Sequence, residues 1–231
     1  MKAFSFEAGE LLLVDKPYGW TSFDVVNYIK HRVKRITGNK KLKVGHAGTL
    51  DPLATGLVMV CTGKMTKSID QLQAERKIYT GSILLGAESA SYDLESKVVR
   101  NHAPLPSETE LDQARQRLIG EIEQVPPVFS AKKVDGKRAY ENARKGIQQV
   151  LKANSIVIYD FRFTRIDIPY LDFELVCSKG TYVRSVAHDL GSLLGCGGVL
   201  TALRRVQSGD HHVRNALKMS ELKIILDKPT L

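Results

Sequence analysis

The sequence predicts an α/β chain in which strands and amphipathic helices are mixed, and three observations carry this prediction. Continuous apolar runs at residues 10–15 and 57–61 are typical of buried strands. Apolar and polar residues alternate along 170–178, which is the period of a half-buried strand. Segments beginning at Thr21 and Ser107 instead show helical spacing behind a capping box.

The first elements are a strand, a turn and a helix. The strand 10–15 is closed by Lys16-Pro17-Tyr18-Gly19, a turn sequence. Thr21 and Asp24 have the spacing of a capping box, so a helix begins there. Its apolar residues recur every three or four positions and are expected on one buried face: Phe23, Val26, Ile29, Val33 and Ile36.

The later elements alternate between the two types. Strands are predicted at 76–85, 155–167, 170–178 and 200–206, and helices follow Ser107 and span 183–194. In the helix after Ser107, four residues are expected to point inward: Leu111, Ala114, Leu118 and Ile119.

The composition favours a polyanionic partner. The 231 residues include 34 Lys or Arg against 25 Asp or Glu, a net charge of +9, which indicates nucleic acid before a membrane surface. No apolar run approaches the ~20 residues of a membrane span, and the N-terminus lacks the apolar region of a signal peptide. Neither a zinc-ligand spacing nor a P-loop is present. Three cysteines without a Cys-x-x-Cys pair are expected to be reduced, in a cytoplasmic protein: Cys61, Cys177 and Cys196.

One stretch, residues 44–57, has the composition of a rigid loop that is partly surrounded by apolar residues. Three glycines, Gly45, Gly48 and Gly56, permit positive φ or close approach of another backbone. Pro52 drives Asp51 toward an extended conformation. Asp51 is therefore a carboxylate on a stiff loop among apolar neighbours.

Basic residues concentrate in two places. Residues 30–43 hold seven Lys or Arg and no acid, including Lys40, Lys41 and Lys43. Charge alone leaves two interpretations open, a solvated face or a phosphate-binding surface, and the position just before the Asp51 loop favours the second. Residues 132–145, which begin with Lys132, hold six bases against two acids and form a second candidate RNA-binding face.

Three strings resemble the motifs of one family, the TruB family of tRNA pseudouridine synthases. They are Gly-His-Ala-Gly-Thr-Leu-Asp-Pro-Leu-Ala-Thr-Gly from Gly45, Ser-Lys-Gly-Thr-Tyr-Val-Arg from Ser178, and the opening Leu-Val-Asp-Lys-Pro pattern. The resemblance covers about 12–206. It weakens at 89–93, where the family's Thr-Asp-Thr-x-Asp becomes Ser-Ala-Ser-Tyr-Asp, so we assign that loop no role beyond substrate contact.

The resemblance implies a mixed, largely antiparallel sheet with flanking helices. It implies one catalytic domain over 1–231, with an RNA-gripping insertion at about 124–146 and no separate C-terminal PUA domain. The implied substrate is the T-loop uridine in the T arm of tRNA, without a cofactor or metal. We expect a monomer.

The resemblance also assigns the site residues. Asp51 is the catalytic carboxylate, Arg184 its ionic partner and Tyr79 the stacking platform for the flipped base. Tyr182 and Leu203 are expected to line the uracil pocket. His46 is expected near the flipped nucleotide, and its neighbouring glycines favour the tip of the loop.

Two matters stay open from the residues. Asp51 could attack C1′ of the sugar, attack C6 of the ring or remove a sugar proton. The rival functions are a non-catalytic tRNA-binding or tRNA-folding protein, which fits the charge equally well, and the same chemistry on another RNA.

Overall fold

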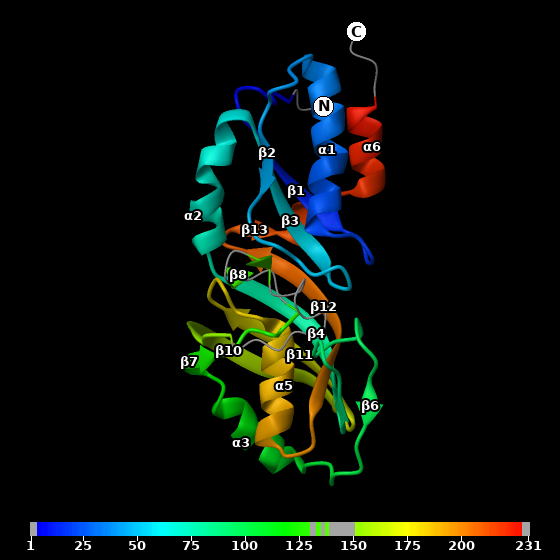
Figure 1. Cartoon of the computed structure of the whole chain (residues 1–231), viewed down its shortest axis with the longest axis vertical. Helices are drawn as coiled ribbons and strands as arrows, with labels where there is room; N and C mark the ends of the chain where they lie inside the picture. The colour runs from blue at the N-terminus through cyan, green and yellow to red at the C-terminus, as the bar shows by residue number, and fades with distance from the viewer. Residues whose placement is uncertain (1–3, 130–132, 135–136, 139–150, 228–231) are drawn as a thin grey trace. The chain divides into compact units, whose positions relative to one another are not determined.

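The computed structural model describes residues 4–129, 133–134, 137–138 and 151–227, so most of the predicted insertion lies outside the described residues (Figure 1). The chain divides into two compact units, one made of Met1–Tyr79 with Arg204–Leu231 and the other of Thr80–Leu203. Strands β4 (Lys77–Leu85) and β12 (Gly198–Ser208) each continue from one unit into the other. The predicted extent of the catalytic domain, 1–231, remains a prediction.

The first unit is built on a mixed sheet. Its strands pair in the order β14 (Leu217–Lys218), β1 (Leu11–Lys16), β3 (Thr55–Thr62) and β12, while β2 (Val44–His46) pairs with β3 and β13 (His211–His212) with β12. β1 and β2 run antiparallel to β3, whereas β12 runs parallel to it. The apolar run predicted at 57–61 is fully buried within β3.

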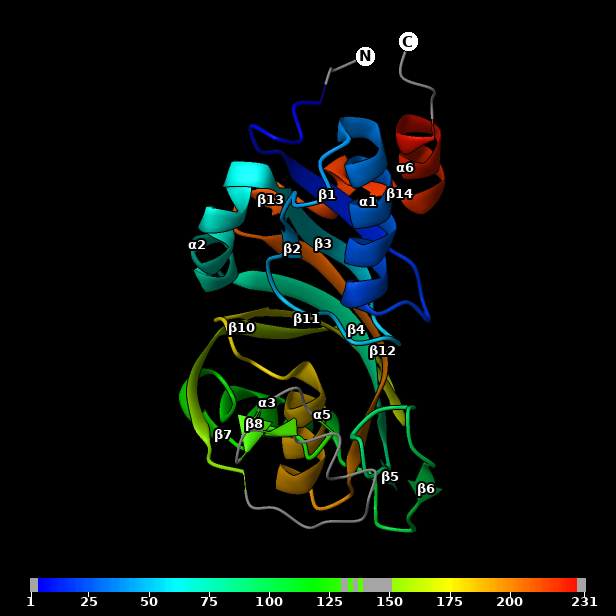
Figure 2. The same cartoon turned by 45° about the horizontal axis from the view of Figure 1, so that its top comes forward.

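Five helical segments accompany this sheet in the described part of the first unit. They are α1 (Ser22–Thr37), the 3₁₀ helix η1 (Gly63–Ser68), α2 (Ile69–Ala74), η2 (Val213–Asn215) and α6 (Met219–Leu226). Figures 1 and 2 both show β2 between α1 and α2, and α6 beside α1. Part of the core lies between η2 and the sheet, where Ala47, Leu57, Met59 and Val213 pack together.

The capping box predicted for α1 is confirmed, because the Thr21 hydroxyl accepts the Asp24 N–H and the Asp24 carboxylate accepts the Thr21 N–H. The inward placement of Phe23 is wrong, since this side chain is 64% exposed. The buried stripe consists of Val25, Val26, Ile29 and Val33. At about 100° per residue, Phe23 lies roughly a quarter turn away from the centre of that stripe.

The second unit pairs its strands in the order β12, β4, β11 (Tyr170–Cys177), β10 (Asn154–Asp167) and β7 (Gly120–Gln124). β10 is antiparallel to both of its neighbours. The alternation predicted for β11 is confirmed, with Leu171, Phe173, Leu175 and Cys177 buried. Two short pairs accompany the sheet, β5 (Ala87–Glu88) with β6 (Val99–Arg100) and β8 (Lys133–Val134) with β9 (Lys137–Arg138).

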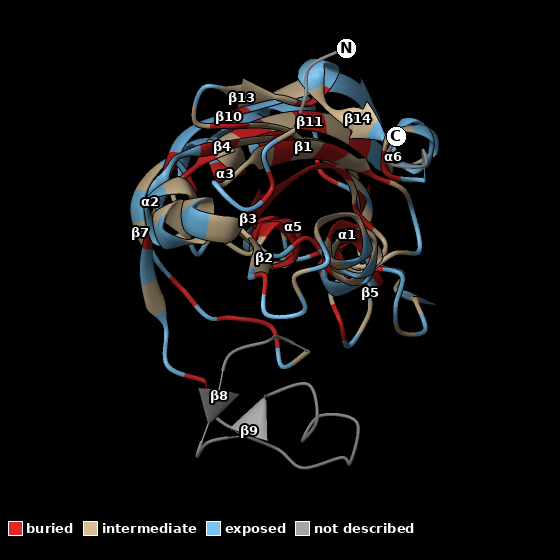
Figure 3. Cartoon of the chain, turned by 90° about the horizontal axis from the view of Figure 1, so that it is seen from above, coloured by how far each residue is buried: buried red, intermediate tan, exposed pale blue. Residues whose placement is uncertain are grey.

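Two helices belong to this unit, α3 (Glu108–Gln116) and α5 (Val183–Leu193). Figure 3 shows α5 largely in the buried colour, and its first five residues are all buried. The capping box at Ser107 and Glu110 is confirmed, as are the buried Leu111 and Ala114. Ile119 was expected inward but is 37% exposed, because the helix ends three residues before it.

The observed architecture confirms a mixed, largely antiparallel sheet with flanking helices. All three cysteines are buried and free, as predicted. Within the described part of the chain, every helix is too short or too polar to span a bilayer.

The α1 stripe makes a stability prediction. Ile29→Ala removes a side chain with no exposed surface and should lower the free energy of unfolding by about 2–5 kcal/mol. Phe23→Ala, on the same helix, should change it by about 0.5 kcal/mol or less because Phe23 is exposed. Urea titration of both variants checks this pair, and comparable losses in the two would contradict the observed helix face.

Candidate active site

Asp51 lies half-buried on the loop that joins β2 to β3. Leu50 before it and Ala54 after it are buried, and the Ala54 N–H donates to the Asp51 carbonyl at 3.1 Å. Gly48 has a φ of 95°, in the region that favours glycine. The loop is therefore anchored by apolar side chains on both sides of the carboxylate, as its sequence predicts.

Ser22 fixes the residue that precedes Asp51. Its hydroxyl oxygen accepts the Leu50 N–H at 2.8 Å and donates to the Leu50 carbonyl at 3.2 Å. Ser22 is itself buried at the first position of α1. Since both polar backbone groups of Leu50 bond one hydroxyl, the start of α1 sets the backbone position of Asp51.

Lys16 fixes the residue that follows Asp51. The Pro52 carbonyl accepts the Gly19 N–H at 2.9 Å and the Lys16 ammonium at 3.3 Å. Lys16 is fully buried and also donates to the carbonyls of Trp20, at 2.6 Å, and Pro17, at 3.2 Å. Its three donors thus join the β1–α1 turn to the Asp51 loop.

The charge of Asp51 acts on the buried ammonium of Lys16. Burial lowers the pKa of Lys16 to about 8, because a low-dielectric surrounding disfavours the ammonium. The negative charge of Asp51 opposes this shift, and the positive charge of Arg205 reinforces it. A carboxylate and two buried cations therefore influence one another within the first unit.

Arg205 ties the two ends of the Asp51 loop together. This side chain is only 2% exposed. Its Nε donates to the Leu57 carbonyl at 2.7 Å, and its two terminal nitrogens donate to the carbonyls of Thr49, at 3.3 Å, and Gly48, at 3.2 Å. Gly48 and Thr49 precede Asp51 and Leu57 follows it, so one guanidinium closes the loop.

Gly56 allows the backbone of β12 to approach this loop. Its φ is 105°, and a Cβ at this position would lie 2.3 Å from the Arg205 carbonyl oxygen. The neighbouring strand residue, Arg204, forms a two-pronged pair with Asp15 at 3.0 and 2.8 Å. Both arginines of β12 are thus engaged with the first unit, and the close approach predicted for Gly56 is confirmed.

His46 ends strand β2, so its expected place at the loop tip is wrong. Burial lowers the pKa of His46 and the charge of Arg205 lowers it further, although a hydrogen bond with the Gly48 backbone acts in the opposite direction. Its buried Nδ1 has no hydrogen-bond partner among the described residues. Burial and the nearby cation thus favour the neutral imidazole. The predicted contact of His46 with the nucleotide remains a prediction.

Tyr79 lies in β4 at the end of the first unit and is 8% exposed. It was predicted to stack on the target base. That role remains a prediction.

Arg184 is the second residue of α5 and is buried. Its Nε lies 3.6 Å from a carboxylate oxygen of Asp93, and its terminal nitrogens donate to the carbonyls of Ser91, at 3.2 Å, and Phe129, at 3.1 Å. Asp93 is held in turn by the Glu95 N–H at 2.9 Å. Arg184 belongs to the second unit and Asp51 to the first, so their predicted pairing remains a prediction.

Asp93 is a residue that the sequence analysis missed. The loop around it was assigned only substrate contact, yet its one acid is the partner of Arg184. Tyr92 beside it has a φ of 63° and stacks on His188, with ring centroids 3.9 Å apart. The available signal was that Asp93 matches the second acid of the family's Thr-Asp-Thr-x-Asp motif, whereas the first acid is replaced.

The remaining predicted residues are placed as follows. Tyr182 caps α5, where its N–H donates to the Gln124 side chain at 2.8 Å and its carbonyl accepts from it at 3.2 Å. Leu203 is half-buried in β12. The exposed side chains of Lys40, Lys41 and Lys43 precede β2, and Lys132 lies outside the described residues.

The arrangement suits acid–base or nucleophilic chemistry by one carboxylate. The backbone on either side of Asp51 is held by buried groups, which fixes the position from which its side chain extends. Among the described residues, no group of three His, Cys, Asp or Glu side chains is placed to hold a metal ion.

Comparison with known proteins assigns the chain to a family. A model described as "TruB family pseudouridylate synthase (N terminal domain)" matches residues 34–183, and one described as "tRNA pseudouridylate synthase B C-terminal domain" matches residues 184–228. The tRNA pseudouridine synthase B of Flavobacterium johnsoniae is 46% identical over 92% of this chain and 93% of its own length. That of Phocaeicola vulgatus is 47% identical over 97% and 96%.

Solved structures share the fold. A Cbf5-Nop10-Gar1 complex contains a chain similar to this one with a TM-score of 0.69 and 27% identity over 94% of the present chain. An H/ACA RNP bound to a substrate RNA containing 2'-deoxyuridine contains another, with a TM-score of 0.66 and 25% identity. The present chain spans about half the length of these solved chains, 54% and 53%.

The matched models define the class of protein as a pseudouridylate synthase. Within that class, the chain belongs to the TruB family, which confirms the family predicted from the motifs.

The buried Lys16 makes a prediction about pH. The pKa of Lys16 is about 8 in the folded protein and 10.5 when unfolded, so between these values the unfolded chain binds more protons. The free energy of unfolding should therefore rise with pH from about 8 to 10.5 relative to Lys16→Met. Denaturant titrations of both proteins at several pH values isolate this group, because other titrating groups cancel in the difference. A difference that stays flat or falls with pH would contradict the burial of a lowered-pKa lysine.

Proposed function

We propose that this chain is a tRNA pseudouridine synthase that converts the T-loop uridine to pseudouridine. The observation that carries the proposal is Asp51, held between the Leu50 and Pro52 anchors within a motif of the TruB family. Curated relatives named tRNA pseudouridine synthase B, which match over nearly their whole length, support the same activity.

The reaction is an isomerisation. The N1–C1′ bond of the uridine breaks, the uracil turns, a C5–C1′ bond forms, and the proton on C5 is finally transferred to N1. Nothing is oxidised or hydrolysed, so the atoms balance without a co-reactant. The uridine must first leave its stack, because its reacting atoms are otherwise inaccessible. Asp51 serves as nucleophile or base, at C1′, at C6 or at a sugar proton.

The other predicted residues take supporting roles in the proposal. By the family resemblance, Arg184 pairs with the Asp51 carboxylate. Within the second unit, its guanidinium is held by Asp93 and two carbonyls. Tyr79 stacks on the flipped base, a contact worth about 1–3 kcal/mol. Tyr182 and Leu203 line the uracil pocket, and His46 lies near the flipped nucleotide.

The T arm of tRNA is the proposed point of recognition. The proposed enzyme works as a monomer, in the cytoplasm, without a cofactor. Lys41 and Lys43, which are exposed before β2, offer phosphate contacts of the kind that a single RNA arm requires.

A non-catalytic tRNA-binding protein is the main rival. Basic charge fits it equally well, but the structure around Asp51 does not favour it. In a protein that only binds RNA, the half-buried carboxylate of Asp51 would repel the RNA phosphates and weaken binding. The same chemistry on another RNA is the second rival, and mapping of the modified position distinguishes it.

Asp51→Asn tests the proposal. This change keeps the size of the side chain but removes the nucleophile or base, so pseudouridine should be undetectable in unmodified tRNA while tRNA affinity stays within about threefold. The matched control is Asp70→Asn, an exposed aspartate of α2 in the same unit, which should retain full activity.

The readout is the position and amount of pseudouridine in full-length tRNA and in an isolated T-arm hairpin. Normal turnover by Asp51→Asn would contradict the proposed chemistry. Modification outside the T loop by the unsubstituted protein would instead indicate another RNA target.

A further inference from the structure

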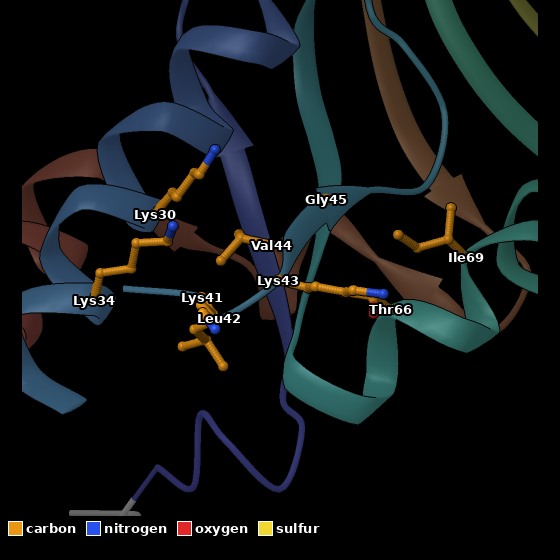
Figure 4. Close-up of a pocket in the computed structure, with 9 residues that line it drawn as sticks. All are labelled: Lys30, Lys34, Lys41, Leu42, Lys43, Val44, Gly45, Thr66 and Ile69. Atoms are coloured by element: carbon orange, nitrogen blue, oxygen red, sulfur yellow. The ribbon is translucent and has the colours of Figure 1, made fainter. Parts of the chain in front are cut away.

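A basic pocket of about 440 Å³ lies on the first unit, and its lining includes neither Lys16, Ser22 nor Arg205 (Figure 4). Lys30 and Lys34 reach it from α1, and Lys41 and Lys43 from the segment before β2. Apolar and small residues complete its lining: Leu42, Val44, Gly45, Thr66 and Ile69. We call this site the four-lysine pocket.

Within the described part of the chain, the lysines of the four-lysine pocket are not paired with acidic side chains. Lys34 donates to the Lys40 carbonyl, which satisfies one donor and leaves the charge in place. An anion bound here would therefore meet four ammonium groups without competition from carboxylates.

The spacing of these lysines concentrates the charge. Lys30 and Lys34 are four residues apart on α1, so they lie on one face of the helix and repel each other. Lys41 lies in a turn, in which the Leu42 N–H donates to the Asn39 carbonyl at 3.2 Å, and Lys43 follows this turn. Both line the same pocket. Such repulsion destabilises the free protein, and a bound polyanion relieves it.

We infer that the four-lysine pocket is a subsite for a backbone phosphate of the RNA substrate. This inference rests on the proposed function. Lysines act on phosphate as point charges and read no base, so the subsite holds the RNA in place without selecting its sequence.

Connection to the Asp51 loop favours RNA over an acidic protein as the occupant. Gly45 lines the pocket, and six residues along the chain lead from it to Asp51. Even fully extended, such a segment spans only about 20 Å. A strand of RNA that delivers its uridine to Asp51 can therefore place a nearby phosphate in the pocket.

The structure separates Lys40 from its neighbours and so supplies a matched control. Lys40, Lys41 and Lys43 were all expected to bind RNA, and all three are exposed. Only Lys41 and Lys43 line the pocket. Charge reversal at Lys40 and at Lys41 changes the net charge equally at adjacent positions, so a difference between the two variants reports on the pocket itself.

The experiment compares Lys41→Glu with Lys40→Glu. Affinity for a T-arm hairpin is measured over a range of salt concentrations, together with the single-turnover rate at saturating RNA and the Tm of the free protein. Lys41→Glu should weaken binding about tenfold or more and reduce the slope of log K against log salt by about 0.7–0.9 for each phosphate that the variant no longer neutralises. Lys40→Glu should stay within about threefold. The rate at saturating RNA and the Tm should not fall in either variant.

Equal losses of affinity in the two variants would overturn the inference, since they would indicate diffuse attraction by the whole basic stretch. Unchanged RNA affinity in Lys41→Glu and in Lys43→Glu would overturn it as well and point to an acidic protein as occupant. Failure of the proposed function gives a different result, because the unsubstituted protein would then form no pseudouridine.

Discussion

The buried guanidinium of Arg205 is the group on which the geometry of the Asp51 loop depends. A charge with 2% exposure is costly unless its donors are satisfied, and here three backbone carbonyls accept them. The acceptors lie on both sides of Asp51, at Gly48, Thr49 and Leu57. Lysine has no planar fork of five donors with which to span them. Gly56 completes the arrangement, because any Cβ there would strike the Arg205 backbone.

The same region concentrates cations next to one carboxylate. Lys16 and Arg205 are both buried, and burial lowers the pKa of Lys16 because the ammonium loses its contact with water. The fold accommodates the buried ammonium of Lys16 because its donors bond three carbonyls and so join the β1–α1 turn to Pro52. Such perturbed groups gather at functional sites, where position matters more than stability. The four-lysine pocket follows the same pattern, because its lysines repel one another and a substrate phosphate would relieve this repulsion.

Structural features that depend on neighbouring residues could be predicted from the sequence, and contacts between residues far apart in the chain could not. Both capping boxes, the alternation of β11 and the family motif that begins at Gly45 depend on residues within a few positions of each other. The Arg184–Asp93 pair joins residues 91 positions apart, and the Arg205–Gly48 bond joins residues 157 apart, so no pattern along the chain reveals either. The sequence indicated Arg205 only as part of a short strand. The error at Phe23 arose because several apolar residues near the start of α1 fit a helical stripe, and packing alone selects Val25.

The most direct test of this account is the single-turnover rate of Arg205→Lys at saturating tRNA. Lysine keeps the positive charge but cannot bond three separate carbonyls, so the change alters the position of Asp51 rather than the field around it. A displacement of about 1 Å can cost on the order of 100-fold in rate. We predict a loss approaching that size with tRNA affinity within about threefold. A rate equal to that of the unsubstituted protein would contradict the claim that Arg205 positions the Asp51 loop for the proposed reaction.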